Sequence, residues 1–358
     1  MPIQKVDIDT FLSLAKQQPV FDVRSPKEFK YAHIPGAYSL PIFSDEERKE
    51  IGTTYKQVSR QEAIEIGLSY FGPKMLDYIM QVKSVLNEKK HNGANQILVH
   101  CWRGGMRSSA MAWLLSFYGF EVVLLEGGYK SYRHFVLKQL EYPFQFNVLG
   151  GYTGSGKTEV LQEMDLYRFP VIDLETLASH KGSAFGALGM KEQPSQEQFE
   201  NDLCSNLLKF YEVRNGAFHQ PKSIWIENES QRIGLVNLTN IFYASLQYAK
   251  VYVLDIPFES RLDFITENYG KFEKEKLIEG VYRIQKRLGG LDTKRTVEFL
   301  QENNIREAFR ILLSYYDKLY LKSSEEKKRK EIVIEAETVE ANINAALVMN
   351  MYNKIKND

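Results

Sequence analysis

Cys101 stands in a loop whose residue types favour a reactive thiolate. Residues 100–108 read His-Cys-Trp-Arg-Gly-Gly-Met-Arg-Ser, after an apolar run and before a helical pattern. The backbone N–H groups of the turn, the positive end of the following helix and the guanidinium groups of Arg103 and Arg107 all favour thiolate over thiol. Because the thiolate is the nucleophile, we expect Cys101 to react near neutral pH. The other cysteine, Cys204, lies in a helical pattern and is expected to be a core residue.

A second loop has the residue types of a phosphate-binding site. Residues 151–158 match the pattern G-x-x-x-x-G-K-S/T between an apolar strand and a helical pattern. Its glycines let several backbone N–H groups converge on one anion, the helix dipole adds positive potential, and the lysine adds a full charge. The pattern leaves open whether the ligand is ATP, GTP or another diphosphate ester, and whether Mg²⁺ accompanies it. The candidate phosphate-binding residues are Gly151, Gly154, Ser155, Gly156, Lys157 and Thr158.

Two further groups of charged residues are candidates for function. The apolar strand 224–226 leads into Glu227 and Glu229, which are candidate acids of the phosphate site; alternatively, both face solvent. A basic group nearer the C-terminus suits the phosphates of an RNA, and the alternative is a solvated helix face. Its members are Arg283, Lys286, Arg287, Lys294 and Arg295.

The elements that must position both loops alternate between strands and helices, which indicates βαβ units and parallel sheets. Short apolar runs predict strands at 20–23, 97–100, 121–125, 146–149, 224–226 and 250–254. The expected fold class is α/β. We expect an N-terminal domain with a parallel sheet over 1–140. A P-loop α/β domain with a C-terminal helical region follows over 141–358.

Composition narrows the class of protein. A chain of 358 residues suggests about two domains, and 44% hydrophobic with 26% charged residues argues against a disordered or fibrous chain. Basic and acidic residues number 46 each, so a polyanion must be bound by a local patch. Two cysteines exclude a disulfide framework and favour a reducing compartment. No signal segment or membrane span is predicted, and the expected location is the cytoplasm.

The surroundings of the cysteine loop resemble rhodanese domains, which are sulfurtransferases. Residues 21–29, Phe-Asp-Val-Arg-Ser-Pro-Lys-Glu-Phe, and 33–37, His-Ile-Pro-Gly-Ala, resemble the first box of that family, and Glu-Gly-Gly at 126–128 resembles its closing box. The resemblance covers residues 8–135, with an unusual stretch at 43–75. The cysteine loop is one residue longer than the commonest sulfurtransferase loop. It can therefore accept a tetrahedral anion as well as a single chalcogen atom.

The fusion of such a domain to a P-loop domain resembles the bacterial tRNA 2-selenouridine synthases, over nearly the whole chain. Segments that match this family are 45–48, 52–57, 127–130, 173–175, 180–186, 227–230, 286–289 and 315–317. The resemblance implies a transferase that acts on 2-thiouridine at the wobble position of tRNA. Geranyl diphosphate first alkylates the sulfur, and the S-geranyl group is then displaced as selenium from selenophosphate is installed.

The same resemblance implies roles for individual residues and partners. Cys101 would carry selenium, with selenophosphate bound by Arg103, Gly104, Gly105 and Arg107, unless the two arginines only brace the loop. Lys181 and Ser183 would close over the diphosphate, unless they form only a surface loop, and Asp22 and Arg24 would support the cysteine loop. No metal ligands and no tightly bound cofactor are expected. The implied partners are tRNA, selenophosphate, geranyl diphosphate and the enzyme that produces selenophosphate, with no membrane.

Two other functions compete with this interpretation. The Cys-x5-Arg spacing of Cys101 and Arg107 also fits a cysteine-dependent phosphatase, here fused to a nucleotide-binding, kinase-like domain. Rapid hydrolysis of an aryl phosphate that depends on Cys101 would favour the phosphatase. A non-catalytic, nucleotide-dependent binding module is the third possibility, and two intact reactive loops argue against it.

Overall fold

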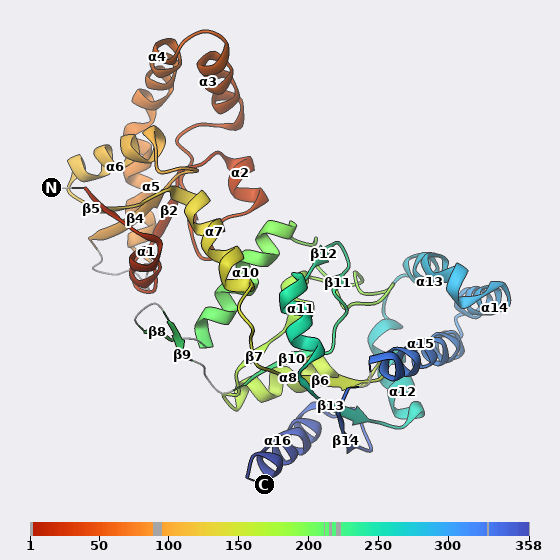
Figure 1. The fold of residues 1–358 in the computed structure, drawn as a ribbon. Coiled ribbons are helices and arrows are strands. Elements are labelled where there is room, and N and C mark those ends of the chain that lie inside the picture. The colour runs from red at the N-terminus through yellow and green to blue at the C-terminus, as the bar shows by residue number, and fades with distance from the viewer. Residues whose placement is uncertain are drawn as a thin grey trace. The chain divides into compact units, whose positions relative to one another are not determined.

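The computed structural model describes residues 3–88, 95–210, 212–214, 217–219, 223–327 and 329–357. The chain divides into two compact units. One comprises Met1–Gln139 with Glu200–Asp202, and the other comprises Leu140–Phe199 with Leu203–Asp358. Each unit is built on a parallel sheet covered by helices, so the α/β class predicted from the sequence is confirmed (Figure 1).

The first unit has a five-stranded sheet in the order β1-β5-β4-β2-β3, and all of its strand pairs are parallel. Its strands are β1 (Gln4–Val6), β2 (Val20–Asp22), β3 (Tyr38–Ser39), β4 (Gln96–His100) and β5 (Glu121–Leu125). Its helices are α1 (Ile8–Leu14), α2 (Pro26–Tyr31), α3 (Asp45–Gln57), α4 (Arg60–Phe71), α5 (Met75–Leu86), α6 (Met106–Tyr118) and α7 (Gly128–Leu140). The edge strands β1 and β3 were not predicted, because runs of three and two residues carry no periodicity.

Apolar runs form the central strands of this unit because both faces of a parallel sheet are covered. Ile97 and Val99 of β4 pack with Val122 and Leu124 of β5 in one buried cluster that also contains Cys101. The unusual stretch at 43–75 folds into α3 and α4, which pack against each other. Both helices begin at a serine whose hydroxyl accepts a hydrogen bond from the first turn.

The second unit has a five-stranded parallel sheet in the order β14-β13-β6-β10-β7. Its strands are β6 (Phe146–Gly151), β7 (Val171–Ile172), β10 (Ile224–Glu227), β13 (Lys250–Asp255) and β14 (Glu331–Glu335). Two antiparallel ribbons pair β8 (Glu212–Arg214) with β9 (Ala217–His219) and β11 (Arg232–Ile233) with β12 (Val236–Asn237).

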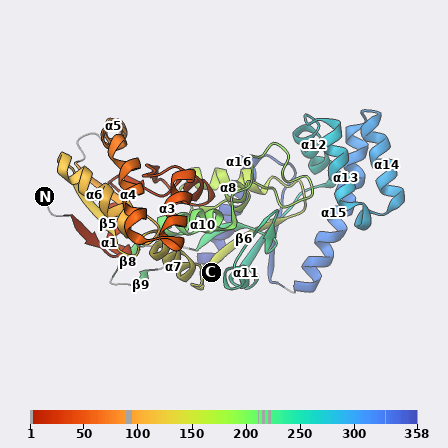
Figure 2. The same ribbon diagram turned by 90° about the horizontal axis from the view of Figure 1, so that it is seen from above.

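Helices of the second unit fall into two groups, apart from α10 (Gln196–Phe210), which is divided between the two units because its residues Glu200–Asp202 belong to the first. Those around the sheet are α8 (Lys157–Leu166), α9 (Leu174–Ala178), α11 (Asn240–Gln247) and α16 (Ala341–Asn357). The others gather at one end of this unit, as Figures 1 and 2 show, and share a separate apolar core. They are α12 (Phe258–Tyr269), α13 (Lys274–Leu288), α14 (Gly290–Gln301) and α15 (Ile305–Lys327). Within the described residues, no helix is long and apolar enough to cross a bilayer.

Candidate active site

The cysteine loop connects β4 to α6 and is held by α7. The N–H groups of Tyr129 and Lys130, in the first turn of α7, donate to the carbonyl oxygens of Cys101 and Trp102 at 2.8 and 2.9 Å. Gly128 lies so close to the loop that a Cβ there would be 2.4 Å from the carbonyl oxygen of Cys101. Its φ of +60° also favours glycine. The closing Glu-Gly-Gly segment thus shapes the loop directly.

Cys101 is buried, with 3% of its surface exposed, and its Sγ lies 3.2 Å from the hydroxyl of Ser108. Burial raises the pKa of the thiol. The Ser108 hydrogen bond, the Arg107 guanidinium and the backbone N–H groups of Ser108 and Arg103 outweigh burial and lower that pKa below its usual value. The expectation of a stabilised thiolate therefore agrees with the geometry, and the groups that stabilise it are the Ser108 hydroxyl, the Arg107 guanidinium and backbone N–H groups. Arg103 contributes its backbone N–H, while its side chain is exposed.

Arg107 points its guanidinium at a carboxylate of the same unit. Its Nη1 donates to Glu28 at 2.9 Å, and Arg48 donates to the same carboxylate at 3.0 Å. Burial of Glu28 raises its pKa, but the two arginines and the Ser25 N–H lower that pKa overall. Arg107 is therefore ordered beside the thiol and shares its charge with Glu28. An anion bound in the loop would compete with this carboxylate for Arg107.

Asp22 and Arg24 form an ion pair beneath the loop. The Arg24 Nη2 donates to Asp22 at 2.6 Å and to the carbonyl oxygen of Ala32 at 2.6 Å. The guanidinium carbon lies 3.7 Å from the centroid of the Tyr129 ring. Arg24 is 1% exposed and Asp22 is fully buried, so neither contacts solvent or a dissolved ligand. Their placement suits support of the loop.

The P-loop connects β6 to α8 and is braced from the helical region. Gly151, Gly154 and Gly156 all have positive φ, which only glycine adopts at low cost. The buried Arg261 donates to the carbonyl oxygen of Thr153 at 3.1 Å and forms a bidentate pair with Asp317 at 2.9 and 2.8 Å. This bracing holds the backbone N–H groups of the loop in place.

Lys157 and Thr158 occupy the first turn of α8. The Lys157 Nζ donates to the carbonyl oxygen of Gly151 at 3.1 Å, and the Thr158 hydroxyl donates to Glu175 at 2.8 Å. Ser155 is fully buried, and its hydroxyl donates to the carbonyl oxygen of Tyr152 at 2.8 Å. Ser155 thus stabilises the turn through its side chain.

A cavity of about 540 Å³ opens in front of the P-loop. Lys181 and Ser183 line it together with the loop, so the expectation that they lie near the phosphate site agrees with the structure. They follow the short helix α9. The side of the cavity formed by the 185–190 segment, α12 and α15 is mainly apolar. This apolar wall consists of Phe185, Met190, Phe264, Ile265, Tyr269, Phe309, Leu312, Leu313 and Tyr316.

The two candidate acids differ in their positions. Glu227 is 1% exposed, lies outside the cavity lining and accepts from the backbone N–H of Leu174 at 2.9 Å. The alternative that both acids face solvent is therefore wrong for Glu227. Glu229 lines the cavity within hydrogen-bonding reach of Glu175, on α9. Burial, reinforced by Glu175, raises the pKa of Glu229 to about 7.

The predicted basic group lies on two helices. Arg283, Lys286 and Arg287 are on α13, whereas Lys294 and Arg295 are on α14. Arg283 is near Glu279 at 3.7 Å, and Lys294 is near Glu298 at 3.8 Å, so part of the charge is balanced locally. The other three form no ion pair with any described residue.

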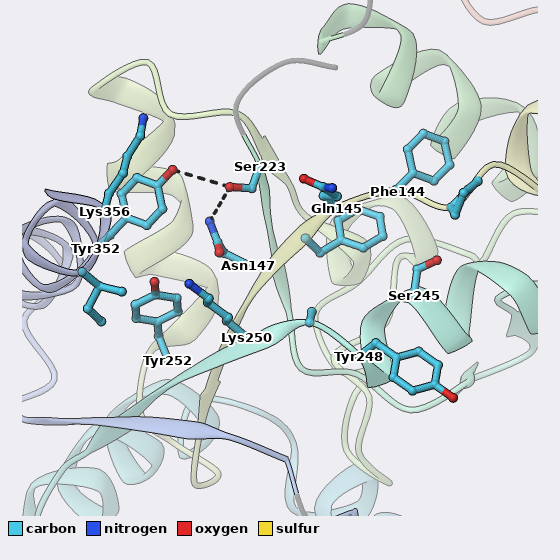
Figure 3. Close-up of a pocket in the computed structure, with 14 residues that line it drawn as sticks. Phe144, Gln145, Asn147, Ser223, Ser245, Tyr248, Lys250, Tyr252, Tyr352 and Lys356 are labelled. Carbon is cyan, nitrogen blue, oxygen red and sulfur yellow. Dashed lines mark hydrogen bonds between the residues drawn. The ribbon is translucent and has the colours of Figure 1, made fainter. Parts of the chain in front are cut away.

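The second unit has another cavity at the amino-terminal ends of β6, β10 and β13, whereas the P-loop follows the carboxyl end of β6 (Figure 3). Asn147 donates to Ser223 at 3.1 Å there, and Ser223 lies 3.5 Å from the hydroxyl of Tyr352. None of the functional residues predicted from the sequence lines this cavity. Within the described residues, no group of three or more His, Cys, Asp or Glu side chains is arranged to hold a metal ion.

Several site residues escaped the sequence analysis. Ser108 lies in the predicted cysteine loop, but its residue type alone predicts no role there. Glu175 lies in a segment that resembles the family, and no function was predicted for its side chain. Glu28 is 79 residues from its partner Arg107, and no local pattern predicts such a pair. Most of the apolar wall comes from α12 and α15, whose apolar residues recur with the same periodicity as in any helix packed against a core.

Comparison with known proteins covers both units. A family model described as tRNA 2-selenouridine synthase AAA domain matches residues 144–350, and a Rhodanese-like domain model matches residues 7–134. Three curated relatives are named tRNA 2-selenouridine synthase. The protein of Hydrogenovibrio crunogenus is 33% identical over 85% of this chain and 89% of its own length. That of Shewanella frigidimarina is 32% identical over 89% and 92%, and that of Nitrosomonas europaea is 36% identical over 70% and 63%.

Proposed function

This chain belongs to the tRNA 2-selenouridine synthase family, and from this premise we propose how its two loops divide the reaction. The relatives are named as synthases of a modified tRNA nucleoside, so the chain is an enzyme that acts on tRNA. We propose that the P-loop cavity binds geranyl diphosphate and transfers the geranyl group to the sulfur of wobble 2-thiouridine. The cysteine loop then binds selenophosphate beside Cys101, and its selenium replaces the S-geranyl group: the C2–Se bond forms, the C2–S bond breaks as geranylthiol leaves, and water takes the phosphoryl group as phosphate.

The apolar wall of the P-loop cavity is the observation that carries this proposal. A nucleoside triphosphate needs polar partners for its base and ribose, whereas a geranyl chain offers only hydrocarbon. Beyond the phosphate-binding turn, Phe264 and Ile265 of α12 and Phe309 and Leu312 of α15 line the cavity. Burying a hydrocarbon chain against such a wall releases about 25 cal/mol per Å² of apolar surface. The cavity therefore suits a diphosphate with an apolar tail.

The polar end of the cavity suits the diphosphate. Backbone N–H groups of the turn, Lys157 and Lys181 supply positive potential, and Ser183 adds a hydroxyl. When a diphosphate binds, Lys157 would exchange its bond to the Gly151 carbonyl for a phosphate oxygen. Cleavage of the geranyl C1–O bond leaves negative charge on the diphosphate, which these groups stabilise.

The cysteine loop suits the second step. Its stabilised thiolate is a soft nucleophile, and its length and the nearby Arg107 suit a tetrahedral anion such as selenophosphate. Neither selenophosphate nor geranyl diphosphate is a resident cofactor; both are consumed. The partners are tRNA with wobble 2-thiouridine and the enzyme that supplies selenophosphate.

The experiment compares the two steps in a Lys157→Ala variant. Loss of one charge-assisted contact costs about 1.5–3 kcal/mol, or roughly ten- to a hundred-fold in binding. We expect geranylation of thiolated tRNA to fall by this factor and selenation of pre-geranylated tRNA to be unchanged, as measured by nucleoside mass spectrometry. Running both assays with and without a chelator shows whether Mg²⁺ takes part. Equal loss of both steps would contradict the division of labour.

The phosphatase alternative rests on the Cys-x5-Arg spacing alone. Arg107 is engaged by Glu28 at 2.9 Å, and the surrounding unit matches the Rhodanese-like domain model. The phosphatase alternative would be supported if the wild-type protein hydrolysed an aryl phosphate and the Cys101→Ser variant did not.

A further inference from the structure

Alkylation of 2-thiouridine on sulfur releases a proton. The C1–O bond of geranyl diphosphate breaks, the S–C1 bond forms, and the diphosphate leaves with the bonding electron pair. The C2=S bond becomes single and C2=N3 becomes double, so N3 loses its hydrogen. We propose that the carboxyl pair Glu175–Glu229 in the P-loop cavity accepts this N3 proton. The inference rests on the proposed function and deepens it by naming the base.

The pair is positioned where the alkylation would take place. Both carboxyl groups line the cavity together with Lys157 and Thr158. The Thr158 hydroxyl donates to Glu175 at 2.8 Å, so the pair is connected directly to the P-loop. On the other side, a Cβ on Gly182 would lie 2.6 Å from the Glu229 Oε2, which shows how closely the 181–183 segment covers this carboxyl group. The pair is thus enclosed by the elements that would bind the diphosphate.

The surroundings of the pair raise the pKa of both carboxyl groups, that of Glu229 to about 7. Burial raises the pKa of both carboxyl groups. The Glu175 carboxylate further raises the pKa of Glu229, and the Asp173 carboxylate further raises that of Glu175, because like charges repel. The positive charge of Lys157 lowers the pKa of both carboxyl groups and so favours their ionised forms. The other titratable groups that act on the pair from the neighbouring elements are Asp173, Lys181, Glu227 and Tyr269.

Other candidates for the base are less suitable. Lys157 and Lys181 are cations and have no free acceptor site. Glu227 lies outside the lining, buried against the backbone of Leu174. Glu159 also lines the cavity, from the first turn of α8, and has no hydrogen bond to either member of the pair. Glu159 therefore serves as the comparison for Glu175 and Glu229.

The test uses the full-length protein, geranyl diphosphate and an anticodon stem-loop RNA with 2-thiouridine at the wobble position. Formation of S-geranyl-2-thiouridine is followed by mass spectrometry between pH 5.5 and 9, for wild type, Glu229→Gln, Glu175→Gln, Glu159→Gln and the off-site control Glu163→Gln. We expect Glu229→Gln to lower kcat roughly a hundred-fold at neutral pH, a typical loss for a general base. Its dissociation constant for geranyl diphosphate should stay within about two-fold, because the base need not bind the diphosphate. Glu175→Gln should show a smaller loss in the same direction.

Two readouts distinguish a proton acceptor from a structural residue. The wild-type rate should rise with pH as the pair loses its proton, and this rise should be absent in Glu229→Gln. The N3–H of 5-fluoro-2-thiouridine is more acidic than that of 2-thiouridine. With a stem-loop that contains this base, the loss in kcat of Glu229→Gln relative to wild type should therefore be smaller.

Three results would overturn the proposal: a wild-type rate in Glu229→Gln, a loss repaired by added Mg²⁺ or explained by weaker diphosphate binding, or a pH-dependent loss in Glu159→Gln instead. Absence of geranylation by the wild-type protein would instead refute the proposed function.

Discussion

The cysteine loop and the P-loop have the same local design and different surroundings. Each follows a buried parallel strand, turns through at least one glycine with positive φ and leads into a helix. Around the cysteine loop, a hydroxyl, a guanidinium and backbone N–H groups converge on one buried sulfur. The P-loop opens into a cavity of about 540 Å³ with an apolar wall and a carboxyl pair. The loop design therefore provides anion binding, while the surrounding walls select the compound that carries the anion.

The largest expected effect comes from a substitution that abolishes the reaction at the cysteine loop and leaves the P-loop reaction unchanged. Cys101→Ser should abolish selenouridine formation, because a serine hydroxyl is not ionised near neutral pH and cannot replace the stabilised thiolate of this loop. Conversion of pre-geranylated tRNA is measured by nucleoside mass spectrometry, and geranylation by the same variant should proceed at the wild-type rate. Cys204→Ser, a buried helix residue, is the matched control. Undiminished selenouridine from Cys101→Ser would refute the role of this loop.

An intermediate effect is expected from the apolar wall. Phe264→Ala removes a ring that lines the cavity. Loss of about 1–2 kcal/mol of apolar contact should weaken geranyl diphosphate roughly 5- to 30-fold. Inorganic diphosphate has no chain to contact the wall, so its affinity should not change. Phe299→Ala, in the core of the helical region but outside the cavity lining, controls for stability. Equal weakening of both ligands would show that the wall only supports the P-loop.

A smaller effect concerns RNA affinity, which depends on neither loop. Replacing Lys286 and Arg287 of α13 by alanine should flatten the log–log salt dependence of tRNA binding by about one to two units, since each neutralised phosphate releases counterions. Affinity for all tRNAs should fall alike, because phosphate contacts position the RNA and base contacts specify it. The matched comparison replaces Lys354 and Lys356 of α16. An unchanged slope in the first variant and a flatter one in the second would mean that the RNA phosphates bind elsewhere.

The smallest effect changes only the titration of the thiol. Burial raises the pKa of Cys101, and the Ser108 hydroxyl is the first of the groups that lower it again. Ser108→Ala should therefore raise this pKa, so that the thiolate forms at higher pH and alkylation by iodoacetamide slows near neutrality. The pH profile of that alkylation measures the shift, with Ser109→Ala as the control. A profile that moves to lower pH would contradict the assigned hydrogen bond.

The sequence predicts the parts of the site that a continuous segment encodes. The cysteine loop and the P-loop could both be found because glycines, the cysteine and the lysine must follow one another at set spacing around an anion. Lys181 and Ser183 were found through family resemblance and do line the cavity.

Contacts between distant segments were not predictable in the same way. Glu175 and Glu229 meet through parallel strands β7 and β10, which bring α9 beside the segment after β10. The helices α12 and α15 provide most of the apolar wall, from residues more than a hundred positions after the P-loop. Their apolar faces have the same periodicity as any packed helix, so sequence alone does not distinguish a ligand wall from a core. A loop sequence also does not show which groups turn inward: Arg103 donates its backbone N–H to Cys101, while its side chain is exposed.

The most direct test of the difference between the loops is a calorimetric titration of the wild-type protein with geranyl diphosphate, inorganic diphosphate and ATP. All three present phosphate oxygens to the P-loop, and only the first presents a hydrocarbon chain to the apolar wall. We expect geranyl diphosphate to bind most tightly, with a more negative heat-capacity change than inorganic diphosphate because apolar surface is buried. Binding of ATP that is as tight or tighter, and that depends on Lys157, would contradict the assignment of this cavity to a prenyl diphosphate.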